Sequence, residues 1–398
     1  MIPNFYPSEF FGGPVTIAFN VAKELVRRGH EVVVYTSDAK DLSHRLLVAE
    51  DNIDGVRIKY FKNLSMWFVK FSKLFITLQM NSELKDCLRE FDIVHAHEYT
   101  TYQNILVHKF SKKYGVPYVL QAHGSLSPIG RKARQSLFDT LFGESILKDA
   151  SKVIALTETE LSQYREAGVS LDRISVIPNG INSEEYSNLP SKNSFKSKFH
   201  IPFQKKVILY LGRIHSSKGI GLLIDAFYLL ISMYGFRNAF LVVAGPDDGF
   251  LQEAKTKVKN LGIKNNVLFT GFIDAQDKMA ALVDADVFVT PSFSGFPMTF
   301  LEACIAGTPI ITTTLGDRID WINNQVGLIS APSSNNLSEA MNRILSNDRL
   351  LEDFSSRCKG IVTSAFSLGF VVSKLENLYA EAIKNTCLRK IDALGVEK

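Results

Sequence analysis

The sequence predicts an α/β protein of two domains, each built on a parallel sheet with helices on both faces. Short apolar runs alternate with amphipathic segments along the chain, the pattern expected when helices connect parallel strands. The length of 398 residues exceeds one ordinary domain. A polar stretch near the middle, residues 187–198, separates one series of strands from another. These three observations together indicate two domains.

Strands are expected where short apolar or β-branched runs are bounded by turn residues. In the first half of the chain they are residues 31–36, 56–61, 92–97, 117–122, 152–155 and 174–177. In the second half they are residues 206–211, 240–244, 266–270, 285–290, 309–312 and 327–329. Helices fill the intervals, and a typical one, from Ile17 to Arg28, is expected to stop at Gly29.

The domain boundary is placed in the polar stretch because it carries a proline and lacks sustained apolar periodicity. The predicted segments are an N-terminal domain (1–186), a linker (187–204), a C-terminal domain (205–365) and a C-terminal helical segment (366–398). The last helix, from about Leu368 to Lys384, is expected to pack back toward the N-terminal domain. A ligand is expected in the cleft between the two domains.

Composition and charge argue against several classes of protein. Hydrophobic residues make up 46% and charged residues 22% of the chain, and the net charge is +4. A surplus this small predicts neither a nucleic-acid binder nor a strongly acidic partner. The four cysteines are far apart without a CxxC pair, which favours reduced thiols and a cytoplasmic location. No apolar run is long enough to span a bilayer, and no signal peptide is recognised before the first motif.

One strand–loop–helix segment carries most of the chemical information. The apolar run Val287–Thr290 enters a loop of small residues, and a helix is expected to begin with Pro297 at its first position and to end at Gly307. Free backbone N–H groups and the helix dipole make such a helix start an anion site. Glu302 could bind the vicinal hydroxyls of a ribose beside a bound diphosphate. The alternative is an ordinary βαβ unit with a solvated Glu302.

Several motifs occur in order along the chain. They are Gly12-Gly13 before an amphipathic helix, His95-Ala-His97, His123-Gly124, Ile177-Pro-Asn-Gly-Ile-Asn182, Gly212-Arg213 with Lys218-Gly219, and the segment from Pro291 to Glu302. Together they resemble the retaining nucleotide-sugar glycosyltransferases of family four, over almost the whole chain. The resemblance implies the GT-B fold, in which two Rossmann-like domains face each other across a cleft. It implies an acceptor in the N-terminal domain and the nucleotide sugar in the C-terminal domain.

The resemblance also implies roles for individual residues. The catalytic positions match His123, beside the transferred sugar, Arg213 and Lys218, on the donor phosphates, and Glu302, on the donor ribose. Losing one group that stabilises developing charge typically costs about 10²–10³ in rate. The remaining donor-binding positions match Gly12, Gly13, Ser294, Gly295, Phe296, Met298 and Thr299. The resemblance implies no metal and no cofactor beyond the nucleotide-diphosphate sugar itself.

Simpler structural interpretations stay open at several of these positions. Gly12-Gly13 could form an ordinary turn that uses the freedom of glycine at φ > 0. A lone histidine such as His123 is more often structural than functional. His95 and His97 project from one face of a strand. Two ligands at that spacing with no third are weak evidence for a metal site, and none is predicted.

The chain departs from the family pattern at two places. The family usually carries a Glu-x7-Glu pair, and here Ser294 occupies the first position while Glu302 keeps the second. Serine is neutral and shorter than glutamate, so we interpret the change as altered sugar recognition rather than lost catalysis. Only Met1–Phe5 precede the glycine loop, so the expected first strand is nearly absent. Our hypothesis is that the true start lies upstream or that the chain is truncated.

The resemblance predicts a glycosyltransferase of the hexosyltransferase type. It would move a sugar, with retention, from a nucleotide-diphosphate sugar to a glycan or lipid-linked acceptor in polysaccharide or glycoconjugate biosynthesis. Two alternatives remain open, because fold does not determine chemistry. One is a nucleotide-sugar 2-epimerase of the same fold, and the other is a catalytically degenerate subunit that only binds nucleotide sugar.

The segment Leu64–Met80 bears on the acceptor. It is rich in large apolar residues and lies among Lys62, Lys70 and Lys73. Such a helix is compatible with peripheral contact at the inner face of a membrane, where a lipid-linked acceptor would be found. The other interpretation, a helix packed in the core of the domain, is favoured because aromatic stripes are more often core than membrane face.

Overall fold

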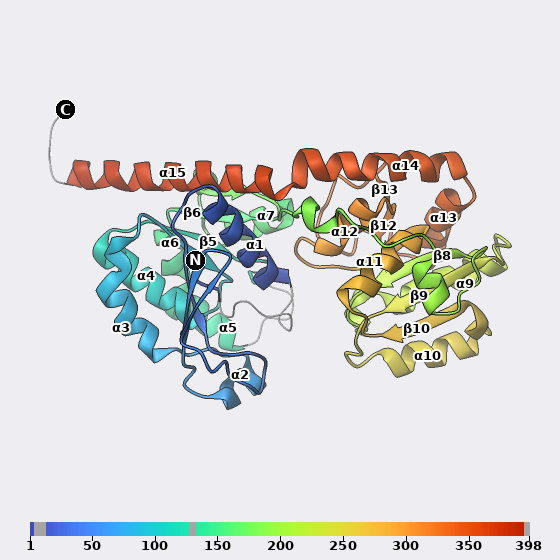
Figure 1. Cartoon of the computed structure of the whole chain (residues 1–398), viewed down its shortest axis with the longest axis horizontal. Helices are drawn as coiled ribbons and strands as arrows, with labels where there is room; N and C mark the ends of the chain where they lie inside the picture. The colour runs from blue at the N-terminus through green and yellow to red at the C-terminus, as the bar shows by residue number, and fades with distance from the viewer. Residues whose placement is uncertain (4–12, 127–132, 394–398) are drawn as a thin grey trace. The chain divides into compact units, whose positions relative to one another are not determined.

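The computed structural model describes residues 1–3, 13–126 and 133–393, and the chain divides into two compact units (Figure 1). Unit 1 comprises residues 1–180 together with 368–398, and unit 2 comprises residues 181–367. Both units consist of mostly parallel strands covered by helices, as the alternation of apolar and amphipathic segments predicts.

Unit 1 contains two sets of hydrogen-bonded strands, in the orders β2-β3-β1 and β4-β5-β6-β7. Their bounds are β1 Val33–Ser37, β2 Glu50–Ile53, β3 Val56–Phe61, β4 Val94–His97, β5 Tyr118–Gln121, β6 Lys152–Ala155 and β7 Ile174–Val176. Strand β2 runs antiparallel to β3, whereas β1 pairs parallel with β3 and β4 to β7 pair parallel in order. Strands β4, β5 and β6 are buried at every residue, as expected for parallel strands covered on both faces.

Met1 and Ile2 join these two sets of strands. Ile2 forms a parallel bridge with Ala96, and its N–H donates to His95 O at 2.9 Å. On the other side, Tyr35 N–H donates to Met1 O at 3.0 Å. The first residues therefore lie in the position expected for the central strand, between β1 and β4, and the next described residue after Pro3 is Gly13.

The helices of unit 1 pack around this sheet. Their bounds are α1 Gly13–Arg27, α2 Met66–Ser72, α3 Leu78–Cys87, α4 Tyr102–Tyr114, α5 Ala133–Phe138, α6 Glu144–Asp149, α7 Glu158–Glu166 and α15 Leu368–Ala393, with 3-10 turns at Leu88–Glu90 and Leu171–Arg173 and a π turn at Asp139–Gly143. Several begin with a side-chain cap, such as Thr101 on α4 and Thr157 on α7. The C-terminal helix α15 belongs to this unit although it follows unit 2 in the sequence.

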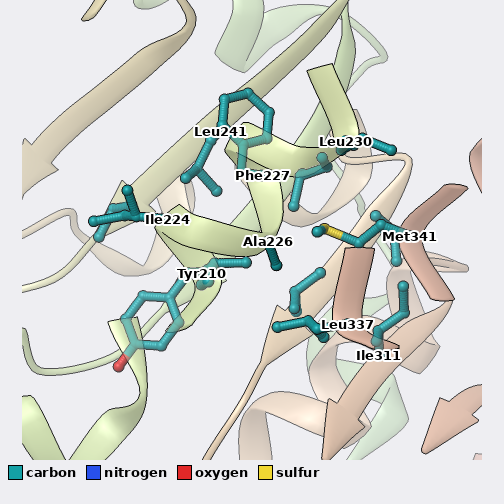
Figure 2. Packing of buried hydrophobic residues seen from close by; sticks show 14 of the residues in the cluster. Tyr210, Ile224, Ala226, Phe227, Leu230, Leu241, Ile311, Leu337 and Met341 are labelled. Atoms are coloured by element: carbon teal, nitrogen blue, oxygen red, sulfur yellow. The ribbon is translucent and has the colours of Figure 1, made fainter. Parts of the chain in front are cut away.

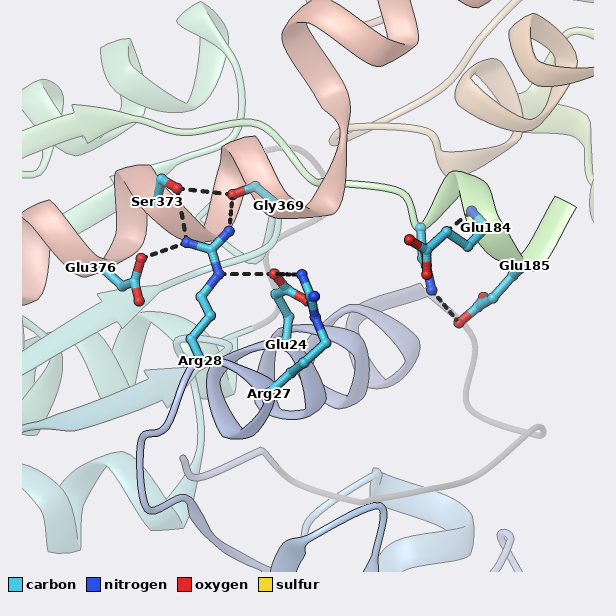
Figure 3. A network of polar contacts seen from close by, with 9 residues as sticks. Glu24, Arg27, Arg28, Glu184, Glu185, Gly369, Ser373 and Glu376 are labelled. Atoms are coloured by element: carbon cyan, nitrogen blue, oxygen red, sulfur yellow. Dashed lines mark hydrogen bonds and ion pairs between the residues drawn. The ribbon is translucent and has the colours of Figure 1, made fainter. Parts of the chain in front are cut away.

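Arg28, directly after the end of α1, connects α15 to α1 through hydrogen bonds (Figure 3). Its guanidinium donates to Gly369 O at 2.6 Å, to Ser373 Oγ at 2.8 Å and to a Glu376 carboxylate oxygen at 2.6 Å. The same guanidinium also donates to Glu24, one turn back on α1, at 2.8 Å. Because four acceptors surround one cation, the contact specifies where α15 lies on α1.

Unit 2 has the strand order β10-β9-β8-β11-β12-β13, with every adjacent pair parallel. The bounds are β8 Lys206–Leu211, β9 Ala239–Ala244, β10 Val267–Gly271, β11 Val287–Thr290, β12 Ile310–Thr313 and β13 Gly327–Ser330. Numbered within the unit this is the order 3-2-1-4-5-6 of a dinucleotide-binding domain. The order reverses between β8 and β11, and in such sheets ligands bind at that point, outside the carboxyl ends of the strands.

The helices of unit 2 are α8 Ser194–Lys198, α9 Ile220–Ser232, α10 Leu251–Asn260, α11 Ala275–Asp284, α12 Met298–Ala306, α13 Ser334–Leu345 and α14 Asp348–Ile361, with short turns at Ser183–Tyr186, Ser216–Lys218, Lys264–Asn266 and Val362–Phe366. Helices α9 and α13 pack together over one face of the sheet (Figure 2). Phe227 and Leu230 of α9 and Met341 of α13 are fully buried there. This core holds the sheet, and therefore the loops at its carboxyl edge, in place.

Most predicted strands are confirmed, and three of them, residues 56–61, 152–155 and 206–211, have the predicted bounds. The short strand β2 was not predicted because its sequence, Glu-Asp-Asn-Ile, is polar and exposed and is ordered only by pairing with β3. The last helix extends to Ala393, beyond the expected end at Lys384.

The division between the units differs from the predicted linker. It lies between Gly180 and Ile181, and the polar stretch belongs to unit 2. There, the Asp284 carboxylate on α11 accepts hydrogen bonds from the backbone N–H groups of Asn193 at 2.5 Å and Lys196 at 2.9 Å. A buried acid thus orders a segment whose composition is typical of a loop.

Candidate donor site

The loops after β8 and β11 meet at the point where the strand order of unit 2 reverses. A methyl group added at Gly219, after the first loop, would lie 2.8 Å from Cβ of Pro291, at the start of the second. Gly219 has φ of +71°, a conformation that suits glycine, so both space and backbone favour glycine here. The contact joins the segment that carries Arg213 and Lys218 to the first residue of the segment that leads into α12.

Helix α12 begins with free backbone donors. The helix begins at Met298, with Pro297 as its N-cap at ψ of 115°, so the predicted start at Pro297 is wrong by one residue. The proline lies before the helix because its extended ψ turns the chain from the loop into the first turn. Phe300 N–H already donates to Pro297 O at 3.1 Å. Among the described residues none accepts from the N–H of Met298 or Thr299, so both are available to an anion.

Two cations lie on the segment that follows β8. Arg213 is exposed and pairs with Asp248 through an Nη1–Oδ2 distance of 2.5 Å. Lys218 is partly buried, and burial, followed by the nearby positive charge of Arg213, lowers the pKa of its ammonium. Within the described residues no carboxylate pairs with Lys218 Nζ. The site therefore has an excess of positive charge that a bound anion would balance.

Glu302 lies one turn further along α12 and is buried, with 7% of its surface exposed. Its Oε1 accepts from Lys278 Nζ of α11 at 2.5 Å and from the Tyr186 hydroxyl at 3.3 Å. Its Oε2 is buried and has no hydrogen-bond partner among the described residues. An acceptor left without a partner in this way is costly unless a ligand supplies a donor, and a ribose hydroxyl is one such donor.

The loop between β11 and α12 is specified by packing around its small residues. Phe296 is buried and its ring lies 5.6 Å from that of Phe366, while Ser294, two residues before Phe296, is exposed. Gly295 adopts φ of +70°, and its N–H donates to Asp317 Oδ2 at 2.7 Å. Asp317 follows β12, so a carboxylate from the next loop lies directly beside Ser294.

His123 follows β5 in unit 1 and has φ of +53°, a conformation uncommon for residues other than glycine. Glu160 holds the turn, because its Oε1 accepts from Gly124 N–H at 2.7 Å and its Oε2 from Leu156 N–H at 2.7 Å. Burial lowers the pKa of His123 to about 3. At neutral pH the imidazole is therefore uncharged and suited to hydrogen bonding rather than to proton donation as an acid.

His95 and His97 extend this histidine into a stack. The rings of His95 and His97 are 4.2 Å apart, and those of His97 and His123 are 5.3 Å apart. His97 Nδ1 lies 2.9 Å from His123 Nε2, and His95 Nδ1 lies 2.7 Å from the hydroxyl of Tyr379 on α15. Burial lowers the pKa of His95 to about 3 and that of His97 well below its usual value. The described ranges contain no group of three or more histidine, cysteine, aspartate or glutamate side chains that could hold a metal ion.

The remaining predicted positions separate into two groups. Gly13 is described as the first residue of α1, where a methyl group would meet no atom within 4 Å, so the structure shows no steric need for glycine there. Gly12 lies outside the described residues. Gly13 and His123 belong to unit 1, whereas the other described donor-site positions belong to unit 2.

Comparison with known proteins identifies the chain. A family model described as Glycosyltransferase Family 4 matches residues 11–185, and one described as Glycosyl transferases group 1 matches residues 191–360. The chain belongs to this glycosyltransferase family. The family uses nucleotide sugars, and the assignment favours a transferase over an epimerase or a degenerate binding subunit.

Individual relatives have low sequence identity to this glycosyltransferase, but the matches extend over nearly the whole of both chains. An uncharacterized glycosyltransferase of Methanocaldococcus jannaschii is 27% identical over 95% of this chain and 97% of its own length. A D-inositol 3-phosphate glycosyltransferase of Corynebacterium glutamicum is 24% identical over 94% of this chain and 93% of its own.

Solved structures show the fold. Anabaena HepE in complex with UDP and glucose matches 95% of this chain and 99% of its own with a TM-score of 0.73 at 18% identity. A sucrose-phosphate synthase of Thermosynechococcus elongatus matches 94% of each chain with a TM-score of 0.75 at 20% identity. At these identities the likeness supports the GT-B fold, with two Rossmann-like domains.

Sequence reasoning missed several polar neighbours of the glycosyltransferase site. Lys278 and Tyr186 surround Glu302 from segments far from it in the sequence, and Asp317 reaches Gly295 from the loop after β12. A signal existed only for Asp317, because polar residues directly after a parallel strand are candidates for a ligand site.

Proposed function

We propose that this glycosyltransferase binds a nucleoside-diphosphate sugar in unit 2 and transfers its sugar with retention to a glycan or lipid-linked acceptor. The observation that carries the proposal is Lys218, a partly buried ammonium with a lowered pKa and no carboxylate partner among the described residues. A diphosphate would balance this charge together with Arg213 and the free N–H groups of Met298 and Thr299.

The proposed mechanism assigns each group to one part of the donor. Negative charge grows on the diphosphate as the bond to the sugar breaks, and Arg213, Lys218 and the start of α12 stabilise that charge. Glu302 Oε2 accepts from a ribose hydroxyl, because that oxygen is buried without a partner in the described structure. Neutral His123 of unit 1 is suited to hydrogen-bonding a hydroxyl group, and its low pKa argues against a role as general acid. The reaction proceeds without a metal or other cofactor.

The proposal for the acceptor depends on apolar side chains that are exposed on and beside α2. Trp67 and Phe71 are 61% and 66% exposed, and Leu64 is 55% exposed. The prediction that this segment packs in the core is therefore only partly correct: Val69, Phe75 and Met80 of the same segment are buried.

Positive charge accompanies these exposed rings. Lys62, Lys70 and Lys73 are exposed around them, and the sequence contains no acidic residue from Lys62 to Ser82. Apolar rings combined with lysines suit a lipid surface that bears negative charge. We propose peripheral contact with such a membrane, where a lipid-linked acceptor would be presented in polysaccharide or glycoconjugate assembly. In the described part of the chain, no helix combines the length and apolarity needed to cross a bilayer.

Isothermal titration calorimetry with UDP, GDP and ADP and their sugar conjugates tests donor binding. We expect one base to bind, and Lys218→Gln to weaken that binding at least about tenfold, because hydrogen bonds to charged groups contribute about 1.5–3 kcal/mol. Lys259→Gln is the matched control, since Lys259 is exposed on α10 of the same unit. If both variants bind like the wild type, the phosphate site is wrongly placed.

Vesicle flotation tests membrane contact. Wild-type protein should float with vesicles of anionic phospholipid and much less with vesicles of neutral phosphatidylcholine. The double variant Trp67→Ser/Phe71→Ser should lose flotation, whereas Phe203→Ser should retain it, because Phe203 is 60% exposed but lies in unit 2. Equal flotation of all three proteins would contradict membrane contact through α2.

A further inference from the structure

We propose that Asp317 supplies the carboxylate that Ser294 lacks and binds hydroxyl groups of the transferred sugar. The inference rests on the proposed function and deepens it, because it names a residue that recognises the sugar. In the family pattern a glutamate stands at position 294, and the serine found here can neither bring a charge nor reach as far.

The geometry places Asp317 at the required spot. Gly295 N–H donates to Asp317 Oδ2 at 2.7 Å, so the carboxylate lies against the peptide that follows Ser294. Gly295 has φ of +70°, a backbone conformation that favours glycine at this turn. The carboxylate of Asp317, which follows β12, therefore contacts the loop that follows β11 in the same sheet.

The two loops that make this contact are locked together. Thr313 Oγ1 donates to Pro291 O at 2.6 Å and accepts from Leu315 N–H at 3.1 Å, which links the ends of β11 and β12. Gly316 lies so close to Phe293 that a methyl group added there would be 2.4 Å from the phenyl ring. The position of Asp317 is therefore held by packing and hydrogen bonds on both sides, as a recognition residue requires.

Asp317 also faces a cavity. The cavity has a volume of about 330 Å³ and is lined by Phe293, Thr312, Thr313, Gly316, Asp317 and Arg318, among others. It lies at the carboxyl edge of the sheet, within the size range of small-molecule sites. One aromatic ring and several polar side chains suit a sugar, whose faces are apolar and whose edges carry hydroxyls.

The chemistry of the carboxylate agrees with this position. The Asp317 Oδ2 atom accepts the hydrogen bond from Gly295 N–H. Burial raises the pKa of the Asp317 carboxyl, and this hydrogen bond opposes the rise. A partly desolvated carboxylate gains from additional donors, and sugar hydroxyls provide them. Ser294 is exposed beside it and can contribute a hydroxyl but no charge.

The test compares binding of the nucleotide sugar with binding of its nucleotide alone, both measured by calorimetry. Asp317→Asn keeps an acceptor for Gly295 N–H and removes the charge. We expect this variant to bind the nucleoside diphosphate within twofold of the wild type and the nucleotide sugar at least about tenfold more weakly. Asp353→Asn is the matched control, because Asp353 is exposed on α14 of the same unit, outside the lining of this cavity, and pairs with Arg357.

Restoring the family arrangement provides the complementary test. Ser294→Glu combined with Asp317→Asn should recover at least half of the lost discrimination between nucleotide sugar and nucleotide. Ser294→Glu alone, which leaves Asp317 and its loop contacts intact, should change nucleotide-sugar affinity at least threefold with nucleotide affinity unchanged.

Two results would overturn the inference. Asp317→Asn could weaken binding of the nucleotide sugar and of the nucleotide equally, which indicates a purely structural role, or it could leave both affinities unchanged. Failure of the proposed function is distinguishable, because wild-type protein would then bind no nucleotide sugar at all.

Discussion

Acid should destabilise unit 1 through the buried histidine stack. His95 is 4% exposed, stacks on His97 and has its pKa lowered to about 3 by burial. In the unfolded chain a histidine has a pKa near 6.5. Between these two values the unfolded state binds the proton and the folded state does not. The stabilisation is therefore complete above about pH 6.5 and is lost as the pH falls toward 3.

The magnitude follows from the two pKa values. For one histidine that shifts from about 6.5 to about 3, the free energy of unfolding falls by about 2 kcal/mol between pH 7 and pH 5. The slope between pH 5 and 6 is about 1.2 kcal/mol per pH unit. His97 and His123 change in the same direction, since burial lowers the pKa of both.

The assay isolates the contribution of one residue. His95→Asn keeps a polar group near the Tyr379 hydroxyl and removes the titration. It should flatten the slope by about 1.2 kcal/mol per pH unit relative to the wild type. Urea unfolding at several pH values is read by pulsed hydrogen exchange and mass spectrometry, using peptides from β4 and β5 for unit 1 and from β8 and β9 for unit 2.

The control variant carries the same His→Asn substitution at an exposed position. His200 is exposed in unit 2 and has φ of +56°, which asparagine tolerates. His200→Asn should leave the slope of unit 1 unchanged. If His95→Asn and His200→Asn give the same slope, the buried stack does not account for acid sensitivity and the reasoning fails.

The remaining predictions concern the site and the core. Glu302→Gln should weaken nucleotide binding about ten- to a hundredfold by calorimetry, because a charged acceptor is lost; unchanged binding would remove Glu302 from the ribose site. Phe227→Ala should lower the stability of unit 2 by about 3–5 kcal/mol in urea, whereas exposed Phe203→Ala should change it by less than about 0.5 kcal/mol. Arg28→Met should speed hydrogen exchange in the first turns of α15, because several hydrogen bonds to that helix are lost; equal exchange rates would show that α15 is held by apolar packing alone.

Much of the fold was predictable because strand and helix periods are local properties. The run Lys206–Leu211 is apolar at nearly every position and became β8 with the predicted bounds. Loop chemistry was also readable, since the proline and glycines around α12 specify where a helix starts and stops. The positions of Arg213 and Lys218 after a strand, and of Met298 at a helix start, therefore pointed to one phosphate site before any contact was known.

Only the tertiary structure determined the contacts between segments that lie far apart in the sequence. The strand order puts the loop after β12 beside the loop after β11, so Asp317 meets Gly295. Helix packing brings Lys278 to Glu302, and pairing with β3 makes a strand of the polar segment β2. Such contacts depend on which elements become neighbours. A single sequence determines by itself the period of each element and the chemistry of each loop, whereas the pairing of loops follows from the order of strands in the folded sheet.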